Sequence, residues 1–146
     1  MKQIDIFYAD DDDDDLMFFN EAIEKISRHV LTQINLHLHK NGESLIENIK
    51  KNETTNGIVF LDINMPFKSG FELLEEIRKE PKIKGVPVVM YSTSSNPENI
   101  DRSKTLGADF YVVKPYKFDN LKNMISTFIQ MDWENNQVDK RTFLYK

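Results

Sequence analysis

The residues that could do chemistry stand where short apolar runs of this chain end. Two carboxylates, Asp10 and Asp11, follow the first run, and Asp62 ends another. The hydroxyl of Ser92 ends a third run, and Lys114 lies at the end of a fourth. Carboxylates, a hydroxyl and an ammonium group are used in proteins to hold a divalent cation and to stabilise a phosphoryl group during transfer. They can act together only if the fold brings the ends of these runs to one place.

The apolar runs alternate with segments of helical periodicity. We expect strands over residues 4–9, 33–39, 57–62, 86–92 and 109–115. Apolar residues recur at helical spacing within residues 16–26, 45–49, 71–78 and 118–129. A further helix is expected over residues 97–107, where Ser95 or Asn96 could act as N-cap, Pro97 would be the first helical residue and Gly107 would end the helix. This alternation predicts an α/β fold with a doubly wound, five-stranded parallel sheet. Right-handed crossovers leave few topologies for such a sheet, and the strand order 2-1-3-4-5 is one of them.

In a doubly wound sheet, ligands bind beyond the carboxyl ends of the strands, near the switch between strands 1 and 3. The polar residues named above would all lie at that edge. Unpaired carboxylates this close repel one another and raise each other's pKa, and a divalent cation removes that cost. Oxygen ligands with no Cys or His nearby favour Mg²⁺, with Mn²⁺ as a possible substitute, over zinc. The sequence therefore predicts a site where a phosphoryl group meets Mg²⁺, a lysine and a hydroxyl.

Asp10 and Asp11 open an unbroken run of aspartates that ends at Asp15. Such a run, taken alone, is usually a solvated charged segment. The preceding buried strand and the distant Asp62 favour a cation-binding role for the first two carboxylates. The other aspartates of the run are expected to begin the first helix. There, negative charge suits the helix dipole and one carboxylate can act as N-cap.

Length and composition limit the classes of protein that need to be considered. With 146 residues, 40% of them hydrophobic, the chain is expected to form about one globular domain. Its net charge of −5 disfavours nucleic acid as a direct partner. The absence of Cys excludes disulfides, thiolate zinc sites and a thiol nucleophile. No apolar segment is long enough for a signal peptide or a membrane span, so we expect a cytoplasmic protein with no membrane partner.

A set of motifs, in this order and spacing, resembles the CheY-like receiver domain of two-component response regulators: ADD, FLDINMP, KSGFELL, VVMYSTS and GADFYVVKP. The resemblance implies the flavodoxin-like fold of that family, in its stand-alone, single-domain type. It predicts a receiver domain over residues 1–130 and a C-terminal extension of unknown role over residues 131–146. The extension is too short for a DNA-binding domain and could pack on the domain or on another copy.

The resemblance implies a role for each acidic residue of the predicted site. Asp62 would accept a phosphoryl group from a phosphohistidine on a partner. Asp11 would bind Mg²⁺ directly and Asp10 largely through water. The phosphoacceptor Asp62 and the backbone carbonyl of Asn64 would be the other protein ligands of the ion.

The resemblance also implies how phosphorylation would be stabilised and sensed. Lys114 would pair with the phosphoryl oxygens, and Pro115 after it suggests a cis peptide bond that fixes where the ammonium points. Ser92 would be the switch hydroxyl that turns toward the phosphoryl group. Tyr111 would be the aromatic residue that changes rotamer with it.

Two histidines stand apart from these motifs. His37 and His39 lie on one face of the second predicted strand, so a metal pair is conceivable. With no Cys and no neighbouring carboxylate strand in view, the polar face of an edge strand is the favoured interpretation.

The leading hypothesis is a single-domain response regulator that catalyses its own phosphorylation and dephosphorylation but acts mainly as a switch. Its expected partners are a sensor histidine kinase or histidine phosphotransfer protein and an unidentified output protein, and a dimer is conceivable. The alternative is a receiver-fold interaction module that does not use phosphorylation; the intact set of Asp11, Asp62, Ser92 and Lys114 argues against it. A haloacid-dehalogenase-like phosphatase needs its nucleophile in a D-x-D pair after strand 1, which the distant Asp62 does not supply.

Overall fold

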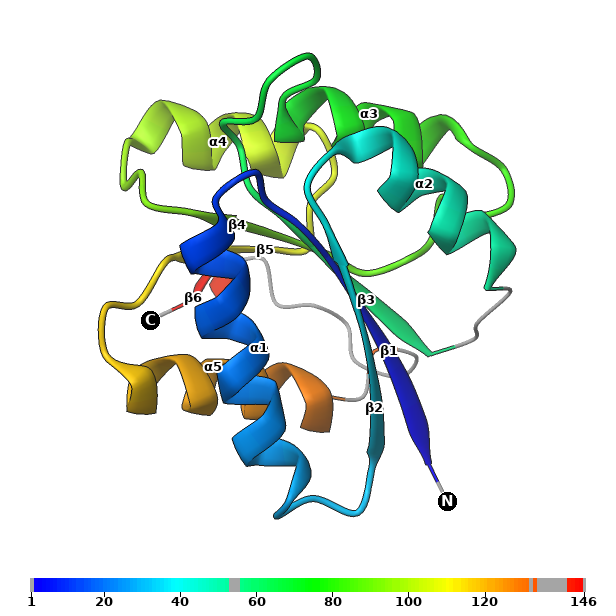
Figure 1. Ribbon diagram of the computed structural model, residues 1–146. Helices are drawn as coiled ribbons and strands as arrows, with labels where there is room; N and C mark the ends of the chain where they lie inside the picture. Colours follow the sequence, from blue (N-terminus) through cyan, green and yellow to red (C-terminus); the bar gives the residue numbers. More distant parts are fainter. Residues whose placement is uncertain (1, 53–55, 132, 134–141, 146) are drawn as a thin grey trace.

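Strands and helices alternate along the chain in the computed structural model, which describes residues 2–52, 56–131, 133 and 142–145 (Figure 1). In chain order the elements are β1 (Gln3–Ala9), α1 (Asp13–Ser27), β2 (Gln33–His39), α2 (Gly42–Lys51), β3 (Gly57–Leu61), α3 (Gly70–Lys79), β4 (Val88–Ser92), α4 (Pro97–Thr105), β5 (Phe110–Val113), α5 (Phe118–Gln130) and β6 (Leu144–Tyr145).

The strands form one parallel sheet in the order β2-β1-β3-β4-β5-β6. The first five strands confirm the predicted order 2-1-3-4-5. The sixth strand is additional: Leu144 aligns with Tyr111 and Tyr145 with Val112, along the outer edge of β5. An edge strand presents unpaired N–H and C=O groups that a passing segment can satisfy, and the end of the chain does this for β5.

Helices cover both faces of the sheet, as the doubly wound prediction requires (Figure 1). On one face α1 and α5 lie side by side, and their apolar stripes meet the sheet in one core cluster. On the other face α2, α3 and α4 cover a second cluster. Every residue of β3 and of β4 is buried, which explains their continuous apolar sequences. The half-exposed β2 lies at an edge, in agreement with its alternating pattern.

Helix caps fix the turns that follow β1, β3 and β4. The Asp12 side chain caps α1 and accepts hydrogen bonds from the backbone N–H groups of Asp14 and Asp15. Ser69 and Glu72 form a reciprocal capping box at the start of α3. Asn96 caps α4, whose first residue is Pro97. The starts of α1, α3 and α4 are therefore fixed by side-chain caps near the carboxyl edge of the sheet.

The described part of the C-terminal extension packs on the domain. The backbone N–H of Tyr111 donates to the Phe143 carbonyl at 2.9 Å, and the Phe143 side chain is buried in the same cluster as Tyr111. The Trp133 indole donates to the Phe128 carbonyl at 3.1 Å. Residues 134–141, also part of the predicted extension, lie outside the described residues. No helix among the described residues is long and apolar enough to cross a membrane.

Candidate phosphoacceptor and metal site

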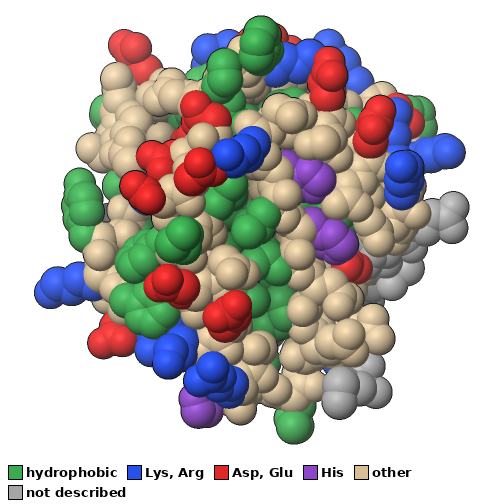
Figure 2. All heavy atoms as spheres, viewed as in Figure 1, with side chains coloured by type: hydrophobic (Ala, Val, Ile, Leu, Met, Phe, Trp, Pro, Cys, Tyr) green, Lys and Arg blue, Asp and Glu red, His purple; other side chains and the backbone are tan. Residues whose placement is uncertain are grey.

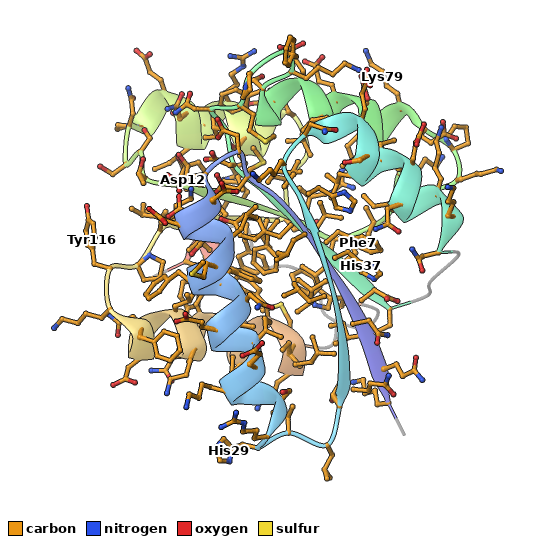
Figure 3. All side chains as sticks on the ribbon, in the orientation of Figure 1. Phe7, Asp12, His29, His37, Lys79 and Tyr116 are labelled. Carbon is orange, nitrogen blue, oxygen red and sulfur yellow. The ribbon has the colours of Figure 1, made fainter. Side chains whose placement is uncertain are left out.

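The sheet brings the three predicted metal-binding carboxylates together. Asp10 and Asp11 follow β1, and Asp62 follows the neighbouring parallel strand β3. The backbone N–H of Asp62 donates to the Ala9 carbonyl at 3.1 Å, which fixes the two strand ends relative to each other. One carboxylate oxygen from each of the three side chains lies within 4.8 Å of the others. Figure 2 shows acidic side chains gathered above the start of α1, where Figure 3 labels Asp12.

This donor set fits a hard divalent cation. The three side chains offer only carboxylate oxygens, and Asp11 is exposed, so an ion could enter from solvent and keep bound water. Asn64 lies two residues after Asp62 in an exposed loop. The metal-binding role of its backbone carbonyl stays a prediction.

Asp10 is fully buried, and each of its carboxylate oxygens has a partner. The Tyr8 hydroxyl donates to Oδ2 at 2.5 Å, and the Asp12 backbone N–H donates to Oδ1 at 3.0 Å. The Lys114 ammonium also donates to Oδ2, at 2.7 Å. Burial, the Asp10 charge and the hydrogen bond to Asp10 together raise the pKa of Tyr8, so its hydroxyl remains a donor. Three hydrogen bonds therefore hold the Asp10 carboxylate in place.

Lys114 reaches into the acidic site from the end of β5. Its Nζ lies 2.7 Å from Asp10, 2.8 Å from Asp15 and 3.6 Å from Asp62 Oδ1. Burial lowers the pKa of Lys114, but hydrogen bonds to Asp10 and Asp15 and the charge of Asp62 outweigh burial and raise it. The ammonium is thus charged and placed beside the predicted phosphoacceptor.

The predicted cis peptide bond before Pro115 is wrong, because no peptide bond of the described residues is cis. The trans isomer of a bond before proline is favoured by about 0.5–1 kcal/mol unless the surroundings select cis. Here the ion pairs of Lys114 with Asp10 and Asp15 fix the direction of the ammonium instead.

Asp15 and Tyr8 contact the site although the sequence analysis did not assign them to it. Tyr8 belongs to an apolar strand and looks like a core residue. Asp15 looks like one of several carboxylates at a helix start. The position of the N-cap could have indicated that Asp15 reaches the site. With Asp12 as N-cap, Asp15 is the third helical residue, and helical side chains tilt toward the N-terminus of the helix. This direction points Asp15 back over the carboxyl edge of the sheet.

Asp62 lies in an environment that disfavours its ionised form. Its exposed fraction is 7%, and burial raises its pKa to about 7, while Lys114 lowers the pKa and Asp10 raises it. The backbone packs equally closely: a Cβ atom on Gly70 would lie 2.2 Å from the Asp62 carbonyl oxygen. Only glycine at the start of α3 allows this approach. A bound cation would favour the ionised carboxylate.

Ser92 and Tyr111 both contact Ser94, in the loop after β4. The Ser92 hydroxyl accepts a hydrogen bond from the Ser94 backbone N–H at 3.1 Å. The Tyr111 hydroxyl donates to the Ser94 carbonyl at 2.8 Å. Both side chains are fully buried, and burial raises the pKa of Tyr111. The two predicted switch residues are therefore linked through one residue of the loop that leads to α4.

Residues 6–126 match the family described as the response regulator receiver domain. The chain belongs to this family. The first five strands of its sheet have the order 2-1-3-4-5, and the acidic residues Asp10, Asp11 and Asp62 lie at the expected strand ends.

The chain is similar to parts of longer curated proteins and to nearly whole chains of solved structures. The chain is 28% identical over 130 residues to a probable cyclic di-GMP phosphodiesterase of Vibrio cholerae, covering 89% of this chain and 27% of that protein. The structure of the phosphorylated cyanobacterial phytochrome response regulator RcpA matches with 25% identity and a TM-score of 0.75, over 90% of this chain and 94% of that one. The Mn²⁺-bound form of response regulator Rcp1 matches with 22% identity and a TM-score of 0.74, over 88% and 96%. The chain spans 17% to 38% of the length of the first five curated relatives.

Proposed function

We propose that this receiver accepts a phosphoryl group on Asp62 from a phosphohistidine donor in a Mg²⁺-dependent reaction. The observation that carries the proposal is the geometry around Asp62. Its carboxylate shares a 4.8 Å cluster with Asp10 and Asp11, and Lys114 Nζ lies 3.6 Å from Oδ1. Mn²⁺, which is bound in the matching structure of response regulator Rcp1, is a possible substitute for Mg²⁺.

In the proposed reaction a carboxylate oxygen of Asp62 attacks the phosphorus atom. The new O–P bond forms as the P–N bond to the donor imidazole breaks, and the electron pair stays on the imidazole nitrogen. Mg²⁺ held by Asp10, Asp11 and Asp62 would supply positive charge to the phosphoryl oxygens. Lys114 would provide a second positive charge, because its ammonium already lies 2.7 Å from Asp10 Oδ2 and 3.6 Å from Asp62 Oδ1.

The phosphoryl group would be sensed by Ser92 and Tyr111. If the Ser92 hydroxyl turns to a phosphoryl oxygen, the Ser94 N–H loses its acceptor. The Tyr111 hydroxyl is bonded to the carbonyl of the same Ser94, so a shift of this residue would reach β5 and α4 together. The surface formed by α4, β5 and α5 would then carry the output.

We further propose that this receiver acts in the cytoplasm, with residues 1–130 as the receiver domain and residues 131–146 as an extension. Its partners would be a sensor histidine kinase or histidine phosphotransfer protein and an output protein bound through protein–protein contacts. Dimer formation is compatible with this role, and direct binding of nucleic acid or membrane is not part of it.

A phosphoryl analogue tests the proposal against the alternative of an interaction module without phosphorylation. Beryllofluoride is added with Mg²⁺ while backbone amide NMR signals are followed. We expect shifts at Asp62, Ser92, Ser94 and Tyr111 that require Mg²⁺ and are absent in Asp62→Asn. An unchanged spectrum in the wild-type protein, or the same shifts in Asp62→Asn, would support the interaction module.

A further inference from the structure

The two histidines of β2 join a polar network between the edge of the sheet and α2. His37 Nε2 lies 3.0 Å from Asp5 Oδ1 on β1, and His39 Nδ1 lies 2.9 Å from Ser44 Oγ on α2. The remaining ring nitrogens face one atom: His37 Nδ1 and His39 Nε2 lie 3.3 and 2.9 Å from Asn48 Nδ2. Figure 2 shows two imidazole side chains next to each other on this face.

The partners of these side chains define where the ring protons lie. Asn52 donates to Asn48 Oδ1, which identifies the other amide atom of Asn48 as the nitrogen that faces the histidines. An amide nitrogen can only donate, so both ring nitrogens that face it must accept. His37 therefore carries its proton on Nε2 toward Asp5, and His39 carries its proton on Nδ1 toward Ser44. Two imidazole lone pairs thus converge on the position of one amide nitrogen.

Converging lone pairs with anchored outer nitrogens are the arrangement of histidine ligands in metal sites. A ligating imidazole is neutral and donates its other N–H to a carboxylate, carbonyl or hydroxyl that fixes its orientation. Burial lowers the pKa of His39, which keeps this ring neutral. The His37 ring is stacked on the Phe7 ring, with 4.6 Å between the ring centroids, and Figure 3 labels both residues. The His37 side chain is 23% exposed. The rings are held in place and remain open to solvent.

We propose that His37 and His39 form a binding site for a divalent transition metal ion that prefers imidazole, such as Zn²⁺ or Ni²⁺. The ion would take the place of the Asn48 amide nitrogen, and Asn48 would turn its oxygen inward as a third ligand. Asp5 and Ser44 would remain as positioning residues behind the two rings. The proposal is independent of phosphorylation and uses no side chain of the acidic site, whose oxygen ligands suit Mg²⁺.

The sequence does not show that the carboxylate of Asp5 lies beside His37, and this contact favours a metal site over a polar strand face. Asp5 lies 32 residues before His37 and comes beside it only because β1 and β2 pair in parallel. Asn48 likewise reaches both rings only because α2 packs over β2.

The test is a Zn²⁺ titration of the chain without a histidine tag, in excess Mg²⁺ to occupy the acidic site, followed by calorimetry and by the NMR signals of the imidazole rings. We expect one Zn²⁺ per chain, with shifted His37 and His39 signals and an unshifted His29 signal. His37→Gln and His39→Gln should each weaken binding by at least about 10-fold, and Asp5→Asn by about 10-fold or more. The matched control His29→Gln, at an exposed position beyond the end of α1, should bind as wild type.

A gain-of-binding variant covers the case that the histidine variants fold poorly. Asn48→Asp places a carboxylate, a stronger metal ligand, where the lone pairs converge, so Zn²⁺ should bind more tightly than to the wild-type chain. A network with only a structural role would show no such gain. Absence of Zn²⁺ binding in excess Mg²⁺, binding unchanged in both histidine variants, or loss of binding in His29→Gln would overturn the proposal.

Discussion

At the scale of single residues, the buried carboxylate of Asp62 couples stability to pH. Its pKa rises from 3.8 to about 7 on folding, so the folded state holds this proton more tightly than the unfolded state. The free-energy cost of burying the ionised Asp62 carboxylate is therefore absent below about pH 3.8 and complete above pH 7. Asp62→Asn removes it, and we expect the metal-free variant to gain on the order of 2 kcal/mol in unfolding free energy at pH 8 and little at pH 4.

Urea unfolding at both pH values, without divalent ions, measures this difference. Asp101→Asn, at an exposed position on α4, serves as the control and should change stability little at either pH. A loss of stability for Asp62→Asn at pH 8, or an equal gain at both pH values, would contradict the buried-carboxylate explanation.

Phe67 gives a second prediction at this scale, because its backbone is strained and its side chain is unsupported. It is 100% exposed and has a φ of 69°, in the left-handed region that bulky residues avoid. Asn tolerates this conformation, so Phe67→Asn should stabilise the protein by about 1 kcal/mol. Thermal unfolding measures the effect. Tyr116→Asn is the control, since Tyr116 is 93% exposed without a positive φ; equal responses of the two variants would argue against strain at Phe67.

The site was predictable in part because its main residues end strands. Asp10, Asp11 and Asp62 converge at one edge, as parallel strand ends must. Contacts that depend on side-chain direction were not visible in the sequence. Asp15 reaches Lys114 from inside a helix, and the isomer of the bond before Pro115 depends on surroundings that the sequence does not show.

At the scale of elements, β6 supports the predicted switch residue. Phe143 is 6% exposed, packs in the cluster that contains Tyr111, and accepts the hydrogen bond from the Tyr111 N–H. Phe143→Ala should loosen β6, lower the unfolding free energy by about 2–3 kcal/mol and speed hydrogen exchange of the Tyr111 amide. Leu144→Ala, at a half-buried position in β6, should have a smaller effect.

Hydrogen exchange followed by NMR tests this prediction. Unchanged protection of the Tyr111 amide in Phe143→Ala would show that β6 does not hold the edge of β5. β6 was not predictable from the sequence, because its two paired residues, Leu144 and Tyr145, are too few to show a hydrophobic period. Their pairing depends on the β5 edge, which exists only once the sheet has formed.

At the scale of the whole molecule, the alternating strand and helix patterns predicted a doubly wound parallel sheet, for which the observed order of β1 to β5 was one of a few possible topologies. The runs of β3 and β4 are apolar throughout because helices cover both faces of the sheet, whereas β2, at an edge, is only partly buried along its length. The apolar pattern of each strand thus indicates how many of its faces the helices bury. The hydrophobic pattern does not predict how particular side chains pack between a helix and the sheet. Asn48 of α2, which contacts the histidines of β2, is an example.

Cation binding should stabilise the whole domain, because only the folded chain gathers the three carboxylates. At a Mg²⁺ concentration about 100 times its dissociation constant, the expected gain is about 2.7 kcal/mol, reversed by a chelator. The gain should be larger at pH 8 than at pH 6, since a proton on Asp62 competes with the ion. Asp11→Asn should remove most of it, whereas Asp13→Asn, whose exposed carboxylate pairs with Lys40, should retain it. Thermal unfolding with and without Mg²⁺ provides the measurement; equal gains in the two variants would contradict a site at Asp11.

Transfer from a small phosphoryl donor tests the proposed chemistry of Asp62 most directly, because it needs no partner protein. The chain is incubated with phosphoramidate, whose P–N bond resembles that of phosphohistidine, and its intact mass is measured. The proposal predicts the addition of one phosphoryl group that requires Mg²⁺, maps to Asp62 and does not occur in Asp62→Asn. A wild-type chain that stays unmodified in the presence of Mg²⁺, or an Asp62→Asn chain modified to the same extent, would contradict it.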